Sequence, residues 1–378
     1  MTTILSHLVG KNTQSVSLNF EQDILHNITE LIENIPGRIE SIGILVSRLD
    51  ESEGAGHVAI RQLRTLRDAG YTPTAFTFEA EIEPDGFRVE EIGNGTLLND
   101  IAVRPRYLFN PLSMLRMARR LSSFDLLVVH QPVLCPVAVL TKYQYGTTTI
   151  YYNHHITEPN EKVGLIEKLF GYTVYRGILY SSTKLDSVVS VSKYSRDEYK
   201  AKFGKTGPVI YNLIDEEFYH EEVSGSPIRD KFGLDNKPVI LYVGRLARSK
   251  RVHELIDVYE RILNTYPDAV LLLVGRKDES DYTEYLVKQK KESDGQIIFT
   301  GMVPESELPH YYAATDVYAT CSEKEGFNLT IAEAEACGTP TVAYDIGAHS
   351  EVQTNGRLVD LGSKDKFASE IIELLRLS

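Results

Sequence analysis

The sequence is poor in the features that mark secreted, membrane-spanning and metal-binding proteins. Its 378 residues include only three cysteines, Cys135, Cys321 and Cys337. Their wide spacing forms neither a disulfide framework nor a metal-ligand pattern, so a reducing cytoplasm is the expected compartment. The opening stretch, MTTILSHLVG, lacks a basic segment followed by a long apolar one, and no signal peptide is expected. The most apolar stretch, LLVVHQPVLCPVAVL, is broken by polar residues and prolines and is too short for a membrane span.

Basic charge is also scarce. The chain has 40 Lys and Arg against 53 Asp and Glu, a formal net charge of −13, which argues against nucleic acid as a partner. Residues 101–220 are the exception, with 15 Lys and Arg against 10 Asp and Glu. Much of this excess lies in RPRYLFNPLSMLRMARRL. Residues 104–120 therefore have two interpretations: a peripheral contact with anionic lipid or a polyprenyl-phosphate carrier, or a solvated helix face. For the arginine stripe of another predicted helix we expect a solvated face: Arg61, Arg64 and Arg67.

Short apolar runs alternate with amphipathic helical patterns along most of the chain. This alternation predicts an α/β fold whose parallel sheets are covered by helices on both faces. One predicted helix, FEQDILHNITELIEN, lies in residues 1–36, which we interpret as an N-terminal helical appendage. The predicted strands are 42–47, 73–78, 125–130, 147–152, 186–192, 207–212, 238–245, 269–275, 296–301, 316–320 and 340–344.

A polar linker, HEEVSGSPIRDKFGLDNKP, interrupts the alternation, which then restarts. We therefore predict two Rossmann-like, doubly wound domains that face a cleft, over residues 37–220 and 221–378. In open α/β sheets, ligands bind beyond the carboxyl ends of the strands. Functional residues should accordingly follow directly after predicted strands.

The stretch VGRLARSK follows the first strand of the second predicted domain. Gly244 gives a turn, and Arg245 and Lys250 precede a helix expected to start near Val252. Two cations beside a helix N-terminus favour a diphosphate, because the helix dipole, backbone N–H groups and side-chain charge add together. The alternative is a solvated basic loop.

A second candidate site is EGFNLTIAEAEACGTP, with two glutamates around one tight turn. Asn328 is expected to cap a helix that begins at Leu329, and Gly338 to follow its end. A carboxylate can accept hydrogen bonds from two neighbouring sugar hydroxyls, so Glu325 and Glu333 could hold the two sugars of a nucleotide sugar. The alternative is that Glu333 and Glu335 are surface residues of the helix.

Taken together, these motifs closely resemble the C-terminal half of the family 4 retaining glycosyltransferases, which have the GT-B fold. The resemblance covers nearly all of residues 238–360, through VGRL…K and GMVPESELPHYYAATDVYATCSEKEGFNLTIAEAEACGTPTVAYDIGAHSEV. It is looser in the N-terminal half, through EGAGHVAIRQLRTLRDAGY, SVVSVSKYS and VIYNLIDEEFY.

The resemblance implies a role for each matching residue. Glu333 would hold the ribose hydroxyls, and Glu325 would lie beside the donor sugar. Arg245 and Lys250 would bind the diphosphate and offset charge on the departing nucleotide. The turn after Glu325 would meet the sugar and phosphate, although many relatives have glycine where this chain has Asn328. The implied donor-binding residues besides Glu333 are Gly326, Phe327, Asn328, Leu329, Gly244 and Met302, with Met302 near the base.

The first predicted domain supplies two further candidates. YYNHHITEP follows a predicted strand at the place where the family has a histidine near the transferred sugar. His154 fits this place best, and His155 is the alternative. A further possibility is a histidine with a purely structural role, whose hydrogen bonds are made within the protein at the strand end. Gly54 and Gly56 in EGAGH open a helix, where a glycine loop would approach the diphosphate.

The implied activity is transfer of a sugar, with retention, from a nucleotide-diphosphate donor to a saccharide or polyprenyl-linked acceptor, in the cytoplasm or at the inner membrane face. No metal or other cofactor is expected, because the chain lacks an Asp-x-Asp motif and the family needs none. An epimerase is disfavoured by the spaced glutamates, and a phosphorylase by the chain length. A non-catalytic GT-B subunit is the main alternative. The end of the chain at EIIELLRLS, beyond which many relatives continue with further helices, argues mildly for this alternative. The presence of Arg245, Lys250, Glu325 and Glu333 argues against it.

Overall fold

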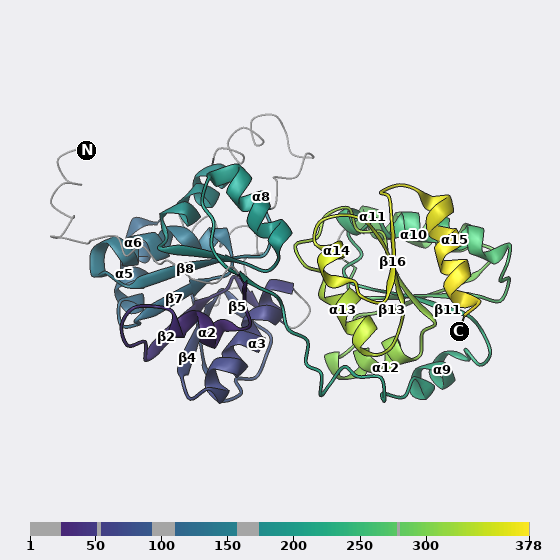
Figure 1. Cartoon of the computed structure of the whole chain (residues 1–378), viewed down its shortest axis with the longest axis horizontal. Coiled ribbons are helices and arrows are strands. Elements are labelled where there is room, and N and C mark those ends of the chain that lie inside the picture. The colour runs from purple at the N-terminus through teal and green to yellow at the C-terminus, as the bar shows by residue number, and fades with distance from the viewer. Residues whose placement is uncertain (1–23, 51–53, 93–109, 157–173, 278–279, 378) are drawn as a thin grey trace. The chain divides into compact units, whose positions relative to one another are not determined.

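The computed structural model describes residues 24–50, 54–92, 110–156, 174–277 and 280–377. The chain divides into two compact units, Met1–Asn212 and Leu213–Ser378 (Figure 1). The sequence predicts the domain boundary between residues 220 and 221, and this boundary stays a prediction. Each unit is described by itself below.

The first unit is built on an eight-stranded sheet in which the paired strands run parallel. Its strand order is β1-β10-β9-β8-β7-β2-β4-β6, so the chain reverses its direction of winding between β2 and β7. The strands are β1 (Ile24–Leu25), β2 (Ser41–Leu45), β4 (Thr72–Thr77), β6 (Arg88–Glu91), β7 (Leu126–Val129), β8 (Thr148–Asn153), β9 (Ser187–Ser190) and β10 (Val209–Ile210), and β3 (Arg48–Leu49) pairs separately with β5 (Glu79–Ala80).

Alternate residues of each strand point to opposite faces of the sheet. Both faces carry apolar side chains, and the helices of the first unit pack against them. One core cluster joins Leu127, Val129 and Tyr151 to Met117 and Leu121 of the covering helices. The described helices are α2 (Ile28–Glu33), α3 (Gly54–Asp68), α5 (Pro111–Leu121), α6 (Cys135–Tyr145) and α8 (Lys193–Phe203), with 3-10 turns η1 (Pro132–Leu134) and η2 (Ser182–Lys184). Residues 174–181 are also helical.

The helix predicted over FEQDILHNITELIEN is shorter in the structure, and a short strand precedes it. Ile24 and Leu25 form β1 and pair with Val209 and Ile210 of β10. The helix starts only at Ile28, because the side chain of Asn27 accepts a hydrogen bond from the backbone N–H of Glu30 and caps it there. Its apolar residues are buried. Residues 24–33 lie in the first unit. The appendage expected over residues 1–36 stays a prediction.

The second unit has a six-stranded sheet of parallel strands in the order β13-β12-β11-β14-β15-β16. The chain winds outward from β11 to β13, returns to β14 beside β11, and winds outward again to β16. This is the doubly wound arrangement, and its switch point lies between β11 and β14. The strands are β11 (Val239–Val243), β12 (Val270–Val274), β13 (Gln296–Gly301), β14 (Val317–Thr320), β15 (Thr341–Tyr344) and β16 (Gly356–Val359).

Helices cover both faces of this second sheet, with α10, α11 and α15 on one face and α12 and α13 on the other (Figure 1). The buried residues of α10 follow helical spacing, and each fully buried aliphatic side chain contributes about 1.5–3 kcal/mol. The helices are α9 (Ser226–Phe232), α10 (Val252–Leu263), α11 (Ser280–Glu292), α12 (Leu308–Ala313), α13 (Leu329–Ala336), α14 (His349–Val352) and α15 (Lys364–Leu375), with 3-10 turns η3 (Arg248–Lys250) and η4 (Glu305–Glu307).

The predicted α/β class and the predicted strands are confirmed, with small shifts at strand ends. The strands that the prediction missed are short or polar, such as β3, β5 and β6. No helix in the described part of the chain is both long and apolar enough to cross a membrane.

Candidate functional site

The switch point of the second sheet brings two of the predicted site loops together. The first loop follows β11 and carries Arg245 and Lys250, and the second follows β14 and carries Glu325. The backbone N–H of Glu323 donates to the carbonyl of Ser249, at 3.1 Å, and so fastens one loop to the other. Ligands of doubly wound sheets bind at this place, because the two loops diverge from neighbouring strands.

Lys250 and Glu325 form the central contact of this site. The Lys250 Nζ lies 2.5 Å from a carboxylate oxygen of Glu325, and their side chains are 23% and 13% exposed. Burial raises the pKa of Glu325, but the charge of Lys250, together with hydrogen bonds from Lys250 and Ser322, lowers it by more. The net pKa lies below the ordinary value, so Glu325 is ionised at neutral pH.

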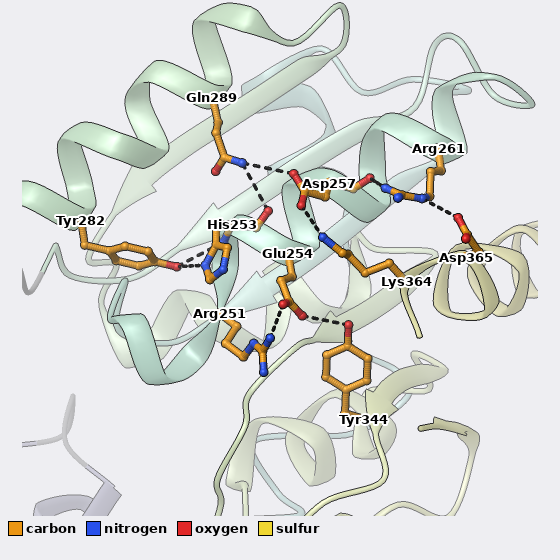
Figure 2. Close-up of polar contacts among 10 residues, drawn as sticks. All are labelled: Arg251, His253, Glu254, Asp257, Arg261, Tyr282, Gln289, Tyr344, Lys364 and Asp365. Carbon is orange, nitrogen blue, oxygen red and sulfur yellow. Dashed lines mark hydrogen bonds and ion pairs between the residues drawn. The ribbon is translucent and has the colours of Figure 1, made fainter. Parts of the chain in front are cut away.

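The residue after Lys250 is held by a polar network (Figure 2). Arg251 has a left-handed backbone, with φ 47° and ψ 38°. Its guanidinium contacts Glu254, which is 6% exposed and accepts a hydrogen bond from the Tyr344 hydroxyl at 3.0 Å. A second guanidinium nitrogen lies 3.6 Å from Glu323. Lys250 is therefore positioned from both sides, by its own pair and by the anchored neighbour.

Further polar contacts fasten α10 to the helices beside it (Figure 2). Asp257 of α10 accepts from Lys364 of α15 at 2.7 Å. His253, also on α10, lies 2.9 Å from the Tyr282 hydroxyl of α11. The N-terminal end of α10, which follows Lys250, thus belongs to a braced group of three helices.

The loop after β15 lies against the backbone of Glu325. Gly347 has φ +55°, and a Cβ there would lie 2.2 Å from the carbonyl oxygen of Glu325. The backbone N–H of Ala348 donates to this same oxygen at 3.4 Å. Only glycine allows this approach, so the backbone position of Glu325 depends on Gly347.

The helix predicted after the Glu325 turn is present, but its cap differs from the expectation. α13 begins at Leu329, and Gly338, with φ +81°, follows its end, as predicted. Asn328 occupies the N-cap position with φ 78°, in the left-handed region, and its side chain makes no capping hydrogen bond. The expectation of a side-chain cap is therefore wrong. Asn tolerates this backbone better than most residues.

The side chain of Asn328 is instead used to hold His349. Its Nδ2 donates to His349 Nε2 at 2.9 Å, and its Oδ1 accepts from Thr330 at 2.7 Å. His349 Nδ1 lies 2.7 Å from the Tyr344 carbonyl, which can only accept, so the proton of His349 is on Nδ1. Burial lowers the pKa of His349 despite the nearby charge of Glu325, and the ring is neutral at pH 7. The sequence motif contained His349, but nothing in its spacing indicated this contact.

Glu333 lies in a different environment from Glu325. It is 4% exposed on α13 and accepts a hydrogen bond from the buried Tyr312 hydroxyl at 2.9 Å. A carboxylate has about four lone-pair directions and can accept from several donors at once. The alternative that Glu333 is an ordinary surface residue is wrong for this structure.

The other predicted residues of the second unit occupy loops and strand ends. Arg245 is exposed, and its carbonyl accepts from the Tyr242 hydroxyl at 2.9 Å. Met302, directly after β13, is 60% exposed. The remaining predicted residues are Gly244 directly after β11, the buried Gly326 and Phe327, and the half-buried Leu329.

In the first unit the structure places His154 directly after β8 and adds two residues that the sequence did not indicate. His154 is half-buried, whereas His155 is exposed. His154 Nε2 lies 3.0 Å from Nδ1 of His130, which directly follows β7. His130 Nε2 lies 3.1 Å from Oε1 of Gln62 on α3. The helix that carries Gln62 begins at Gly54, as predicted, with Gly56 buried in its first turn.

The basic faces of the first unit are partly paired. Arg67 forms ion pairs with Asp68 and Asp85, at 2.8 and 2.6 Å. Arg61, Arg64 and Arg67 are all half-buried, so this stripe is less solvated than expected. On α5, Arg120 pairs with Glu90, and Leu112 and Leu115 are 64% and 37% exposed. Residues 104–109 of the second basic segment lie outside the described residues. Within the described part of the chain, no group of three or more His, Cys, Asp and Glu could hold a metal ion.

Comparison with known families divides the chain in a similar way. Residues 52–218 match the model of Glycosyltransferase Family 4, and residues 226–378 match that of Glycosyl transferases group 1. A putative glycosyltransferase of Bacillus subtilis, YtcC, is 32% identical over 44% of this chain and 44% of its own length. A GDP-mannose-dependent α-(1-6)-phosphatidylinositol monomannoside mannosyltransferase of Mycolicibacterium smegmatis is 28% identical over 50% of this chain and 53% of its own. In these alignments the chain spans about half the length of the curated relatives it matches.

Solved structures show the same fold. Anabaena Alr3699/HepE, in a complex with UDP and glucose, aligns with a TM-score of 0.72 at 22% identity, over 89% of this chain and 90% of that one. WaaG, a glycosyltransferase involved in lipopolysaccharide biosynthesis, aligns with a TM-score of 0.69 at 14% identity, over the same shares. Two parallel α/β units, these GT-B neighbours and the two family matches lead to one conclusion: the chain belongs to the family 4 glycosyltransferases, with a group 1 glycosyltransferase domain as its second half.

Proposed function

We propose that the chain is a retaining glycosyltransferase that moves a sugar from a nucleotide-diphosphate donor to a saccharide or lipid-linked saccharide acceptor. The observation that carries this proposal is the Lys250–Glu325 pair at the switch point of the second sheet. A cation and a carboxylate at this place suit the two parts of such a donor. The cation suits the diphosphate, and the carboxylate suits the sugar hydroxyls.

Binding of the donor would change the partner of Lys250. The diphosphate carries more charge than one carboxylate, so it would draw the ammonium away from Glu325. The carboxylate of Glu325 would then be available to accept hydrogen bonds from the donor sugar. Glu333, buried on α13, would accept hydrogen bonds from the ribose and keep its contact with Tyr312.

In the reaction, the bond between the anomeric carbon and the diphosphate oxygen breaks, and its electron pair leaves with the diphosphate. The acceptor oxygen attacks the same face of the anomeric carbon, and its proton passes to the leaving phosphate oxygen. Lys250 and the exposed Arg245 would stabilise the charge that develops there. Such electrostatic stabilisation is worth about 3–4 kcal/mol for one well-placed group. Because these two cations meet the charge, we propose that no metal or other cofactor takes part.

We assign the acceptor side to the first unit, with His154 as the residue near the transferred sugar. The exposed leucines and arginines of α5 suit peripheral contact with a membrane that carries a lipid-linked acceptor. All three cysteines are free and buried, which suits a cytoplasmic enzyme.

The names of similar proteins support a nucleotide sugar as donor but differ in its base. One relative is named as dependent on GDP-mannose, and one similar structure was determined with UDP-glucose. The first experiment is therefore a thermal-shift screen of the purified protein with UDP, GDP, ADP and their common sugar conjugates. We expect one nucleotide to raise the melting temperature clearly.

The preferred donor is then used with a panel of saccharide acceptors, and the configuration of the product is read by NMR. An unchanged anomeric configuration supports retention, and an inverted one contradicts it. A cooperatively melting protein that no nucleotide stabilises would contradict the transferase and favour the non-catalytic subunit.

A further inference from the structure

Behind the proposed catalytic histidine, the first unit contains a buried chain of hydrogen bonds. Residues two apart along a strand lie on the same face of a sheet, so Tyr152 of β8 and His154, directly after β8, lie on the same face. His130, directly after β7, stacks on Tyr152, with ring centroids 5.0 Å apart and planes 22° apart. The His130 ring lies between His154 on one side, at 3.0 Å, and Gln62 on the other, at 3.1 Å.

The position of Gln62 is set by how closely α3 approaches the chain before it. A Cβ on Gly56 would lie 2.6 Å from the carbonyl oxygen of Asp50 and 2.9 Å from that of Arg48. Glycine at this place lets the first turn of α3 lie against that backbone. Gln62, further along the helix, is 7% exposed. Its amide is therefore a fixed group, with Oε1 facing His130.

The direction of each hydrogen bond follows from the chemistry of the groups. Burial lowers the pKa of His130 to about 3, so the ring is neutral and carries one proton. Oε1 of Gln62 can only accept, which places that proton on Nε2 of His130. Nδ1 of His130 is then an acceptor, and the proton that it receives is on Nε2 of His154. Burial and the neighbouring His130 and His155 also lower the pKa of His154, so its Nδ1 carries a lone pair.

The backbone of His154 is held as firmly as its ring. Its carbonyl accepts from the Ser195 hydroxyl at 3.0 Å. The preceding Asn153, which is buried, donates its side-chain N–H to the Ser195 carbonyl, also at 3.0 Å. The start of α8 thus fixes the main chain while His130 fixes the ring plane. On the opposite side of the network, the Tyr152 hydroxyl donates to the Ile210 carbonyl at 3.3 Å.

We propose that Gln62 and His130 are positioning residues that hold His154 in its Nε2–H tautomer, so that Nδ1 accepts a hydrogen bond from a hydroxyl of the sugar being transferred. The role toward the sugar rests on the proposed function, whereas the tautomer does not. A freely rotating or opposite tautomer would present an N–H to the sugar in place of a lone pair. His130 itself, 1% exposed, touches no substrate and acts through His154.

The test uses a matched pair of variants at His130. Asn places its side-chain oxygen close to the position of the His Nδ1 atom, whereas Leu has nearly the same shape and no acceptor. Both variants remove the ring and the contact with Gln62, so they share any effect of the smaller side chain. The tautomer of His154 is read from long-range ¹H–¹⁵N spectra of the full chain labelled in histidine, and its signals are assigned with His154→Gln.

We expect the Nε2–H tautomer of His154 in the wild-type protein and in His130→Asn, and a mixture of tautomers in His130→Leu. An Nδ1–H tautomer in the wild type, or an unchanged pattern in His130→Leu, would overturn the proposal. Urea denaturation of all variants shows whether they are folded. If His130→Leu does not fold, two variants of Gln62 are compared in the same way. Gln62→Met removes the acceptor for the Nε2–H of His130, and Gln62→Glu keeps it.

The catalytic consequence is measured with the donor found in the nucleotide screen. Loss of one oriented hydrogen bond of about 1.4 kcal/mol lowers kcat about tenfold in His130→Leu, with the KM for the donor unchanged. His130→Asn should keep kcat close to wild type. Equal kcat in the Asn and Leu variants would overturn the positioning role even if the tautomer differs. A wild-type protein without transfer or nucleotide binding would instead contradict the proposed function, and the NMR result would still decide the tautomer.

Discussion

Replacement of Arg251 by glycine separates two opposing contributions of this residue to stability. The left-handed backbone, with φ 47°, costs a non-glycine residue about 1 kcal/mol, which glycine relieves. The guanidinium, however, is the ion-pair partner of Glu254, which is 6% exposed. Removal of one partner of a buried pair costs about 3–5 kcal/mol, and the lower end applies because Arg251 is 25% exposed and Tyr344 still donates to Glu254. We therefore expect Arg251→Gly to lower the free energy of unfolding by about 2 kcal/mol.

Two companion variants make this prediction specific. Arg251→Ala keeps the strained backbone and should cost about 1 kcal/mol more than Arg251→Gly. Glu254→Gln in the glycine background removes the buried charge but keeps an acceptor for Tyr344, and should recover most of the loss. Urea unfolding is followed by near-ultraviolet circular dichroism of tyrosine, because the chain has no tryptophan. A double variant that is no more stable than Arg251→Gly would refute the reasoning about the uncompensated carboxylate.

Three further predictions concern ligand binding, acidity and the membrane. Glu333→Gln should weaken binding of the nucleoside diphosphate about tenfold but leave inorganic diphosphate unaffected, because only the former has a ribose, and calorimetry with both ligands checks this. His130 has a pKa of about 3 in the folded protein against an ordinary 6.5, so the unfolded chain binds its proton first and stability falls as pH drops below about 6.5. The loss from His130 is about 1 kcal/mol per pH unit, and urea midpoints between pH 7.5 and 5 should depend less on pH in His130→Asn. Leu112→Ser should weaken co-flotation with vesicles of anionic lipid, and equal flotation of variant and wild type would argue for a solvated α5.

Much of the fold could be predicted because both sheets are parallel and buried. Strands such as β11 and β12 are continuous apolar runs, and their ends coincide with turn residues such as Gly244 and Gly275. The short edge strand β1 could not be predicted, because two residues give no pattern and its partner lies far along the chain. The polar strand β6 likewise lacks an apolar run.

The candidate site was predictable where it depended on position after a strand, and not where it depended on contacts across the fold. Lys250 and Glu325 each follow a strand, and the strand order that joins them is common to doubly wound sheets. The left-handed backbone of Asn328 is a property of the folded turn that the sequence does not show. Asn328 with this backbone makes no side-chain capping hydrogen bond, in contrast to the prediction. Glu333 and Tyr312 meet only when α12 and α13 pack.

The place of His130 in the sequence does carry a signal that it lies near His154. His130 directly follows the buried strand β7, at the same edge of the sheet as His154 after β8. Parallel neighbouring strands end at one edge, so two histidines in these positions are expected to lie close together. The contribution of Gln62 had no such signal, because it comes from the face of a helix.

The most direct test of the proposed site is the affinity of the preferred nucleoside diphosphate for Lys250→Met. Calorimetry compares this variant with the wild type and with Lys231→Met, a matched control that removes an exposed lysine of the same unit paired with Glu307. If Lys250 leaves Glu325 to bind the diphosphate, its loss should weaken binding about 10- to 100-fold, and the control should bind like wild type. Equal affinities in all three proteins would contradict the assignment of the diphosphate to the switch point of the second sheet.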